Sequence, residues 1–83
     1  GLNVVPKAAK GLLAKIKEGK LKVPFSARDI YHGNHWSGLA NADQVREVIH
    51  YLIEKKYLSE EIEMYGRRAI TKYLVHPKFD QFL

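Results

Sequence analysis

Residues 57–76 read "YLSEEIEMYGRRAITKYLVH" and decide the fold that the sequence predicts. Residues 57–64 show an alternating pattern, and residues 69–76 are rich in β-branched and aromatic side chains, which is typical of strands. Gly66 lies between the two runs and supplies the backbone freedom that a tight turn needs. We therefore predict two strands joined by a tight turn, with Pro77 ending the second strand.

Upstream of this hairpin, the first predicted element is a helix over residues 4–18. Pro6 is tolerated in its first turn, and Gly19 ends it. Residues 20–25, "KLKVPF", should form a short extended segment, because the residue before Pro24 is pushed away from helical geometry. The helix is amphipathic, with an apolar side and a basic side formed by Val5, Ala8, Ala9, Leu12 and Ile16 and by Lys7, Lys10 and Lys17.

A second, short helix is predicted over residues 27–32. Ser26 is placed to cap it, and Asp29 at its third position completes something close to a capping box. Gly33 ends the helix, after which the chain has to turn toward the next one. Gly33 and Gly38 can take the positive φ values that such a turn requires.

The loop "YHGNHWSGLAN", residues 31–41, contains a His-x-x-His pair that invites a comparison with metal sites. His32 and His35 lie across a glycine and a predicted helix end, so they are not held at helical spacing, and no third ligand is evident. Trp36 and Leu39 are best explained as plugs, that is, as apolar side chains that pack the loop against the core. We therefore expect a structural turn without a metal.

The third helix is predicted to start at Asn41 or Asp43 and to run to about Lys56. Its apolar stripe, which extends to Lys56, contains Val45, Val48, Ile49 and Leu52. The opposite and most exposed line contains Asp43, Glu47, His50 and Glu54.

The predicted order is thus helix, short strand, helix, turn, helix, strand, tight turn and strand. This is the order of an α+β winged helix-turn-helix domain. Three helices alone would fit a small bundle, and the basic-tipped hairpin directly after the third helix makes the prediction specific. We expect one domain over residues 1–83, with residues 1–3 and 78–83 as flexible or partner-binding ends.

The composition and the distribution of charge limit the class of protein to which the chain can belong. The chain has 83 residues, no cysteine and a formal charge of +5, and 46% of its residues are hydrophobic. Residues 1–28 contain seven basic side chains and one acidic, whereas residues 29–83 contain seven basic and eight acidic, so the basicity is N-terminal. With no membrane span, no disulfide scaffold and no initiator Met, we expect a cytoplasmic domain cut from a larger protein.

Nothing in the sequence favours catalysis. The residues Ser26, Ser37, Ser59 and Thr71 have no nearby histidine and acid in a recurrent arrangement, and there is no glycine-rich phosphate loop. Glu60 and Glu61 are neighbours in a predicted strand, where adjacent side chains point to opposite faces. A chain this short also leaves little room for a catalytic cleft. We expect no enzymatic activity, no cofactor, no metal and no small-molecule substrate.

Residues 21–79 resemble the C-terminal winged-helix modules of large phage, prophage and plasmid-type replication proteins, which carry primase or helicase domains upstream. The resemblance rests on residues 25–31 "FSARDIY", the turn 36–39 "WSGL", residues 45–58, and the wing 66–67 with "KYLV" and Pro77 after it. Two features depart from that pattern, a longer loop at residues 32–35 and acidic side chains in the wing. The resemblance implies DNA and the upstream domains of the same parent protein as partners.

In the usual winged-helix mode, the third helix enters the major groove and the wing contacts the backbone or the minor groove. The candidate contacts in the wing and at the start of the second helix are Arg67, Arg68, Lys72, Ser26 and Arg28, and those on the third helix are Gln44, Arg46, His50 and Lys55. Three carboxylates on the exposed line of that helix would repel phosphates, so groove entry would have to be tilted or absent.

Two hypotheses follow for the partner. In the first, the domain binds nucleic acid, duplex or single-stranded, and tethers or positions a replication enzyme, with the lysines of the first helix adding non-specific phosphate contacts. In the second, the winged helix is a protein-interaction or intramolecular docking module that uses Phe79, Phe82 and Leu83 as anchors.

Overall fold

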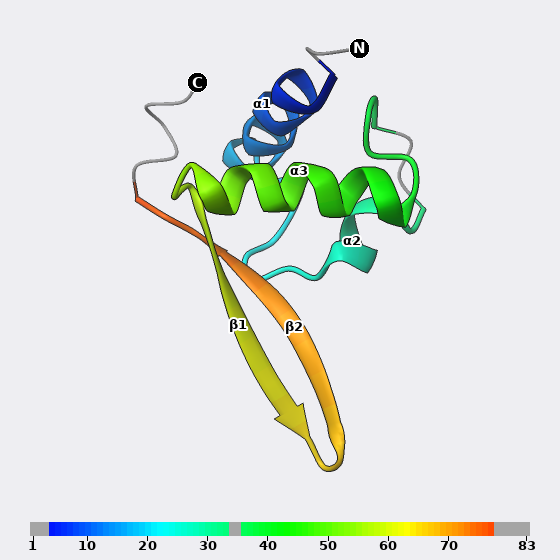
Figure 1. Ribbon diagram of the computed structural model, residues 1–83, viewed down its shortest axis with the longest axis vertical. Coiled ribbons are helices and arrows are strands. Elements are labelled where there is room, and N and C mark those ends of the chain that lie inside the picture. The colour runs from blue at the N-terminus through cyan, green and yellow to red at the C-terminus, as the bar shows by residue number, and fades with distance from the viewer. Residues whose placement is uncertain (1–3, 34–35, 78–83) are drawn as a thin grey trace.

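A computed structural model of the chain describes residues 4–33 and 36–77. It has a small α+β architecture of three helices followed by a two-stranded antiparallel hairpin (Figure 1). The helices stack into a body, and the hairpin leaves the end of the third helix and projects away from that body. This arrangement is compatible with the expected winged helix. The elements are α1 (Val4–Lys17), α2 (Ala27–Tyr31), α3 (Ala42–Glu54), β1 (Leu58–Tyr65) and β2 (Arg68–Val75).

The start of α2 confirms the predicted capping box. Ser26 Oγ accepts a hydrogen bond from the Asp29 N–H at 3.3 Å, and Asp29 Oδ2 accepts one from the Ser26 N–H at 2.9 Å. Of the two predicted starts of α3, Asn41 is the N-cap, since its Oδ1 accepts the Gln44 N–H at 2.9 Å. These local bonds satisfy N–H groups that the helices cannot satisfy themselves.

The C-terminal ends of the helices fall slightly earlier than predicted, at Lys17, Tyr31 and Glu54. The end of α1 is closed by Gly19 with φ of 80°, as expected for a glycine after the last turn. The end of α3 has the same geometry, with Lys56 N–H donating to the Ile53 carbonyl and Tyr57 N–H to that of Leu52, each at 2.9 Å. Lys56 was predicted to lie in the helix, but it takes φ of 66° in the left-handed region instead.

The core lies between α1, α3 and the segments before and after α2. The predicted stripe of α3 is buried, and Leu39 is buried as the predicted plug, but Trp36 is only partly buried against the core. Gly38 has φ of 76°, and a Cβ there would lie 2.7 Å from Ala8 Cβ, so the loop packs directly on α1. The buried residues are Ala8, Ala9, Leu12, Leu13, Leu21, Phe25, Ile30, Leu39, Val45, Val48, Ile49, Leu52 and Leu58.

The short strand predicted over residues 20–25 is reduced to one pairing, between Phe25 and Tyr73. The Phe25 N–H donates to the Tyr73 carbonyl at 3.1 Å, and the Tyr73 N–H donates to the Phe25 carbonyl at 2.7 Å. The two rings pack with centroids 5.8 Å apart. The Val23–Pro24 peptide bond before them is cis. This pairing ties the hairpin to the segment that leads into α2.

The hairpin has a two-residue turn, because Tyr65 pairs with Arg68 and only Gly66 and Arg67 lie between them. Gly66 takes φ of 63° at the first central position, which is the arrangement of a type II′ turn. The prediction of a tight turn at Gly66 is therefore confirmed. Among the described residues, no helix has the length and apolarity that crossing a membrane demands.

Candidate nucleic-acid interface

The register of the hairpin assigns each strand residue to one of two faces, since directly paired residues point to the same side. One face is occupied by Leu58, Glu60, Ile62, Met64, Ala69, Thr71, Tyr73 and Val75. The other carries Ser59, Glu61, Glu63, Tyr65, Arg68, Ile70, Lys72 and Leu74. The predicted site residues Arg68 and Lys72 therefore share a face, on which Lys72 lies across from Glu61 and Arg68 lies across from Tyr65.

A hollow lies between the start of α2 and the outer part of β2. It brings together four of the predicted site residues, and its lining consists of Ser26, Arg28, Tyr65, Arg68, Ala69, Ile70, Thr71 and Lys72. The capping box fixes the start of α2, the helix that carries Arg28 into the lining of the hollow. The hollow thus combines side chains from the start of α2 with side chains from the hairpin, which lies far from α2 in the sequence.

Backbone groups of β2 also point into this hollow. Tyr73 exchanges both of its backbone hydrogen bonds with Phe25, so its N–H and C=O point away from β1. In an antiparallel strand, alternate residues direct their backbone groups to the same edge. Thr71 and Ala69 therefore turn their N–H and C=O groups toward the hollow, where none of the strands among the described residues pairs with them. The edge of β2 offers N–H donors beside cationic side chains.

Within the part of the chain that the structure describes, no ion pair is seen to the cations around the hollow. Ion pairs seen among residues 4–33 and 36–77 include those that join Lys20 to Glu18 at 3.3 Å, Arg46 to Asp43 at 3.8 Å and His50 to Glu54 at 2.9 Å. None of them involves Arg28, Arg67, Arg68 or Lys72. Arg67 and Arg68 are exposed at the tip of the hairpin, as predicted. This end of the molecule therefore has positive charge available for an anionic partner.

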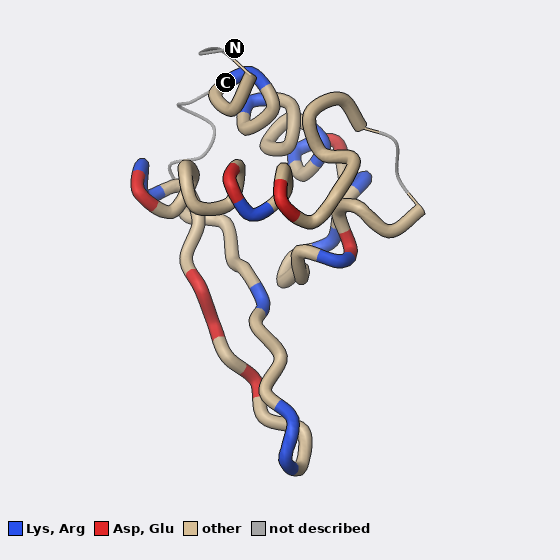
Figure 2. The backbone as a smooth tube through the Cα atoms, turned by 45° about the vertical axis from the view of Figure 1, so that its right-hand side comes forward, with Lys and Arg blue, Asp and Glu red and all other residues tan. Residues whose placement is uncertain are grey.

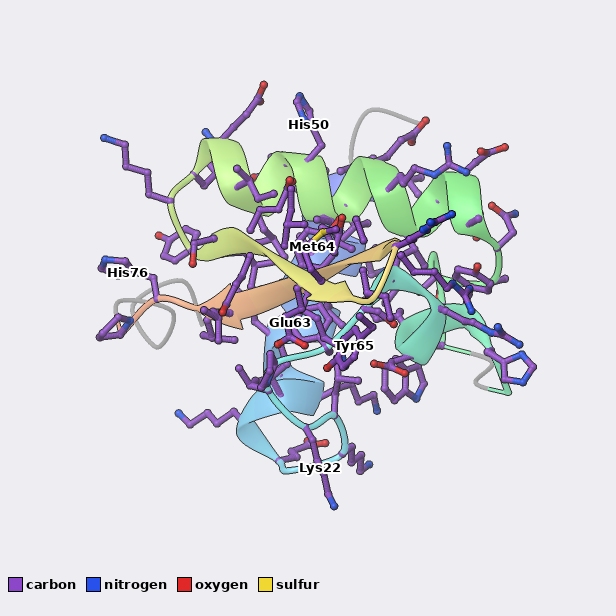
Figure 3. The ribbon with its side chains drawn as sticks, turned by 90° about the horizontal axis from the view of Figure 1, so that it is seen from below. Lys22, His50, Glu63, Met64, Tyr65 and His76 are labelled. Atoms are coloured by element: carbon purple, nitrogen blue, oxygen red, sulfur yellow. The ribbon has the colours of Figure 1, made fainter. Side chains whose placement is uncertain are left out.

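The side chains predicted to contact DNA from α3 interact with residues of α3 or of the loop just before it. Arg46 and His50 pair with carboxylates of their own helix, and His50 points away from the hairpin (Figure 3). Gln44 Oε1 accepts the Ala40 N–H at 2.9 Å, so this side chain helps to close the start of the helix. Lys55 Nζ lies 5.7 Å from the ring centroid of Tyr51, at the C-terminal end.

Gln44 was predicted from its position on α3 alone, and its structural role was missed. A signal for that role was present, because Asn41 and Gln44 have the spacing of a helix start in which both side chains bond to backbone N–H groups. The predicted exposed line of α3 is confirmed, since Asp43, Glu47, His50 and Glu54 are all exposed. Carboxylates outnumber cations along that line, which disfavours close approach to phosphates.

Two tyrosines of the hairpin have raised pKa values. Burial, followed by the nearby charge of Glu60, raises the pKa of Tyr73, and the charge of Arg46 opposes this change. For Tyr65, the hydrogen bond that its hydroxyl donates to Glu63 Oε2 at 2.6 Å is the main cause of a raised pKa. Both hydroxyls therefore remain protonated donors at neutral pH.

The charges are separated along the molecule (Figure 2). Basic residues mark α1 at one end and the hairpin tip at the other, and acidic residues follow β1 and alternate with a basic one on α3. β2 bears Arg68 and Lys72 but no acidic residue. The two basic surfaces are therefore distinct, and an acidic region lies between them.

The histidine pair of the loop is not fully described. His32 is exposed, whereas His35 lies outside the described residues, as do Phe79, Phe82 and Leu83. Within residues 4–33 and 36–77, no three His, Asp or Glu side chains lie close enough to hold a metal ion.

Comparisons with known proteins give no relative: no family model matches the chain, and neither a curated protein nor a solved structure does so. A function has to be argued from the residues of this chain.

Proposed function

We propose that the chain is a nucleic-acid-binding winged-helix module in which β1 and β2 form the wing. Support comes from the order of the elements, because α2 and α3 are two helices joined by a turn and the hairpin follows α3 directly, which is the order of a winged helix-turn-helix. The main contact is the hollow between α2 and the wing, extended by Arg67 at the tip. The module is non-catalytic and needs no cofactor.

The observation that carries this proposal is the convergence of unneutralised cations and backbone donors at one edge of the wing. Arg28, Arg68 and Lys72 line the hollow together with Thr71 and Ala69, whose N–H groups point into it. Phosphate oxygens accept hydrogen bonds from guanidinium, ammonium and backbone N–H groups alike. An extended phosphate backbone that follows the edge of β2 would satisfy all three kinds of donor.

Such contacts position a nucleic acid without reading its sequence. On α3, Arg46 and His50 are paired with carboxylates, and Glu47 adds a further negative charge. We therefore propose that α3 contributes little base recognition and that binding depends weakly on sequence. The resemblance of residues 21–79 to modules of replication proteins supports a role as a tether that positions a larger primase- or helicase-type protein on DNA.

The test is a salt titration of duplex binding by the Arg68→Ala and Lys72→Ala double variant. Each lost phosphate contact removes about one released counterion, so the slope of log affinity against log salt should shrink by about two units. The matched control is Lys20→Ala with Lys22→Ala, which removes the same charge from outside the hollow and should leave most of the slope. Equal effects of the two double variants would contradict a built contact.

A second candidate function is a docking module for a basic protein surface. It is favoured by the exposed carboxylates on α3 and β1, which are Glu47, Glu54, Glu60 and Glu61. Under this alternative, Glu60→Lys with Glu61→Lys should abolish a protein association that the Arg68 and Lys72 changes leave intact. Under the nucleic-acid proposal, Glu47→Ala and Glu54→Ala should leave duplex binding unchanged or strengthen it, because they remove repulsion.

A further inference from the structure

A second groove lies at the other end of the molecule, between α1 and the loop that precedes α3. Its lining includes Lys7, Gly11 and Lys15 of α1, together with Trp36 and the start of α3 at Gln44. None of these residues belongs to the hollow beside the wing. The groove therefore offers a surface that the proposed duplex contact does not use.

We propose that this groove binds single-stranded nucleic acid, with one base stacked on Trp36 and the flanking phosphates held by Lys7 and Lys15. The inference deepens the proposed function, because it assigns a second class of nucleic acid to the same module. The two surfaces would place a single strand and a duplex at opposite ends of one small domain.

Trp36 has the position that base stacking needs. Its ring packs partly against the core, which fixes it, and the remainder lines the groove. Lys15 Nζ lies over the ring, 5.9 Å from its centroid, and Lys15 lines the same groove as Trp36. Stacking of a base on an aromatic ring is generally stronger than an exposed cation–π contact. A base can therefore displace the ammonium group, which then lies close to a neighbouring phosphate.

The charge of α1 favours a polyanion. The helix contains Lys7, Lys10, Lys15 and Lys17 and no acidic residue, and the next carboxylate, Glu18, is paired with Lys20. Each lysine near the groove therefore attracts phosphates without an opposing carboxylate on the same helix. An acidic peptide would be attracted by the same charges, but it would gain nothing from the indole ring unless it also carried aromatic groups.

Gly11 supplies an independent observation. A glycine inside a helix is unfavourable relative to alanine, because it loses more backbone freedom on folding. No atom of the described residues lies within 4 Å of the position that a Cβ would occupy at Gly11, so close packing within them does not require a glycine here. The missing side chain leaves open space in the lining of the groove, which allows a planar base to approach the backbone of α1.

The test uses the fluorescence of Trp36, the only tryptophan of the chain. Titration with an oligothymidylate of about 12 nucleotides should quench this fluorescence, because stacking brings a base against the indole. Gly11→Gln places a neutral, helix-favouring side chain in the groove and should weaken binding about tenfold without loss of helix content. A Gly11→Gln protein that binds and quenches like the parent would overturn the proposal.

Lys7→Ala and Lys10→Ala form a matched pair, since both remove one charge from α1 but only Lys7 lines the groove. Lys7→Ala should weaken oligothymidylate binding severalfold more than Lys10→Ala. Equal losses, or equal quenching by polyglutamate, would show general attraction to a basic helix and refute a groove for single strands.

Failure of this inference is distinguishable from failure of the duplex contact. The Arg68→Ala and Lys72→Ala double variant should lose duplex affinity, measured by anisotropy of a labelled duplex, and keep the Trp36 quench. Gly11→Gln should keep the duplex affinity and weaken the quenching of Trp36 by oligothymidylate. A double variant that loses both signals together would contradict two separate surfaces.

Discussion

The helical body and the outer half of the hairpin differ in how many buried side chains stabilise them. The body contains nearly all of the buried side chains, whereas Leu58 at the base is the only buried residue of the two strands. Toward the tip, Ile62, Met64 and Tyr65 are 60%, 63% and 56% exposed. Stability and the proposed duplex contact therefore reside in different parts of the chain, and substitutions should separate them.

The largest expected effect comes from Phe25, which is 0% exposed and joins the body to the hairpin. Phe25→Ala removes a buried ring and leaves a cavity, so it should lower the free energy of unfolding by about 3 to 5 kcal/mol. Chemical denaturation followed by circular dichroism measures this loss. Phe25→Leu, as the control, should cost clearly less. A loss below about 1 kcal/mol for the alanine variant would show that the junction is not part of the core.

Gly38→Ala should have the next largest effect. Its φ of 76° disfavours any side chain, and the new Cβ would lie 2.7 Å from Ala8 Cβ. Backbone strain of about 1 to 2 kcal/mol and overpacking of about 1 to 3 kcal/mol together predict a loss of roughly 2 to 5 kcal/mol. Gly66→Ala is the matched control, because Gly66 has φ of 63° with open space around it. Equal losses at both positions would contradict the close approach of the loop to α1.

Lys56 lies where the body joins the hairpin, and Lys56→Gly should stabilise the protein. A backbone φ of 66° is strained for lysine but not for glycine. The backbone hydrogen bonds at the end of α3 do not depend on the side chain, so the variant keeps them. We expect a gain of about 0.5 to 1 kcal/mol in thermal or chemical unfolding. Lys55→Gly, in the right-handed region at φ of −81°, should instead destabilise. A stabilising Lys55→Gly would refute the assignment.

The smallest effect is expected at the outer hairpin. Met64→Ala should change the free energy of unfolding by less than about 0.5 kcal/mol, because the side chain is 63% exposed. Leu58→Ala, at the base of the same strand and 3% exposed, should cost about 2 to 5 kcal/mol. Similar losses at Met64 and Leu58 would remove the distinction between body and outer hairpin.

Sequence predicted well what local chemistry and periodicity determine. The capping box at Ser26 and Asp29, the buried stripe of α3 and the turn at Gly66 all depend on residues close together in the chain. The early end of α3 could not be predicted in this way, since a lysine in the left-handed region contradicts local preference. The hydrogen bonds that Lys56 and Tyr57 donate to the carbonyls of Ile53 and Leu52 close the helix there.

The candidate site was predicted less completely. Sequence indicated Arg28, Arg68 and Lys72 separately, but their meeting in one hollow depends on the pairing of Phe25 with Tyr73, which joins distant segments. Arg46 and His50 pair with acids of their own helix, and the spacings of three and four residues are the sequence signal for these pairs. Trp36 was expected to be a plug, and its groove-facing side requires knowledge of where α1 lies.

The pairing of Phe25 with Tyr73 also bears on the order in which the chain folds. Contacts within the helices and within the hairpin join near neighbours, whereas this pairing closes a loop that contains both α2 and α3. Closing a large loop costs conformational entropy before any contact repays it. We expect the pairing to form after the folding transition state, so Phe25 variants should accelerate unfolding more than they slow refolding. The direction in which the hairpin points would then be the last feature of the native state to be fixed.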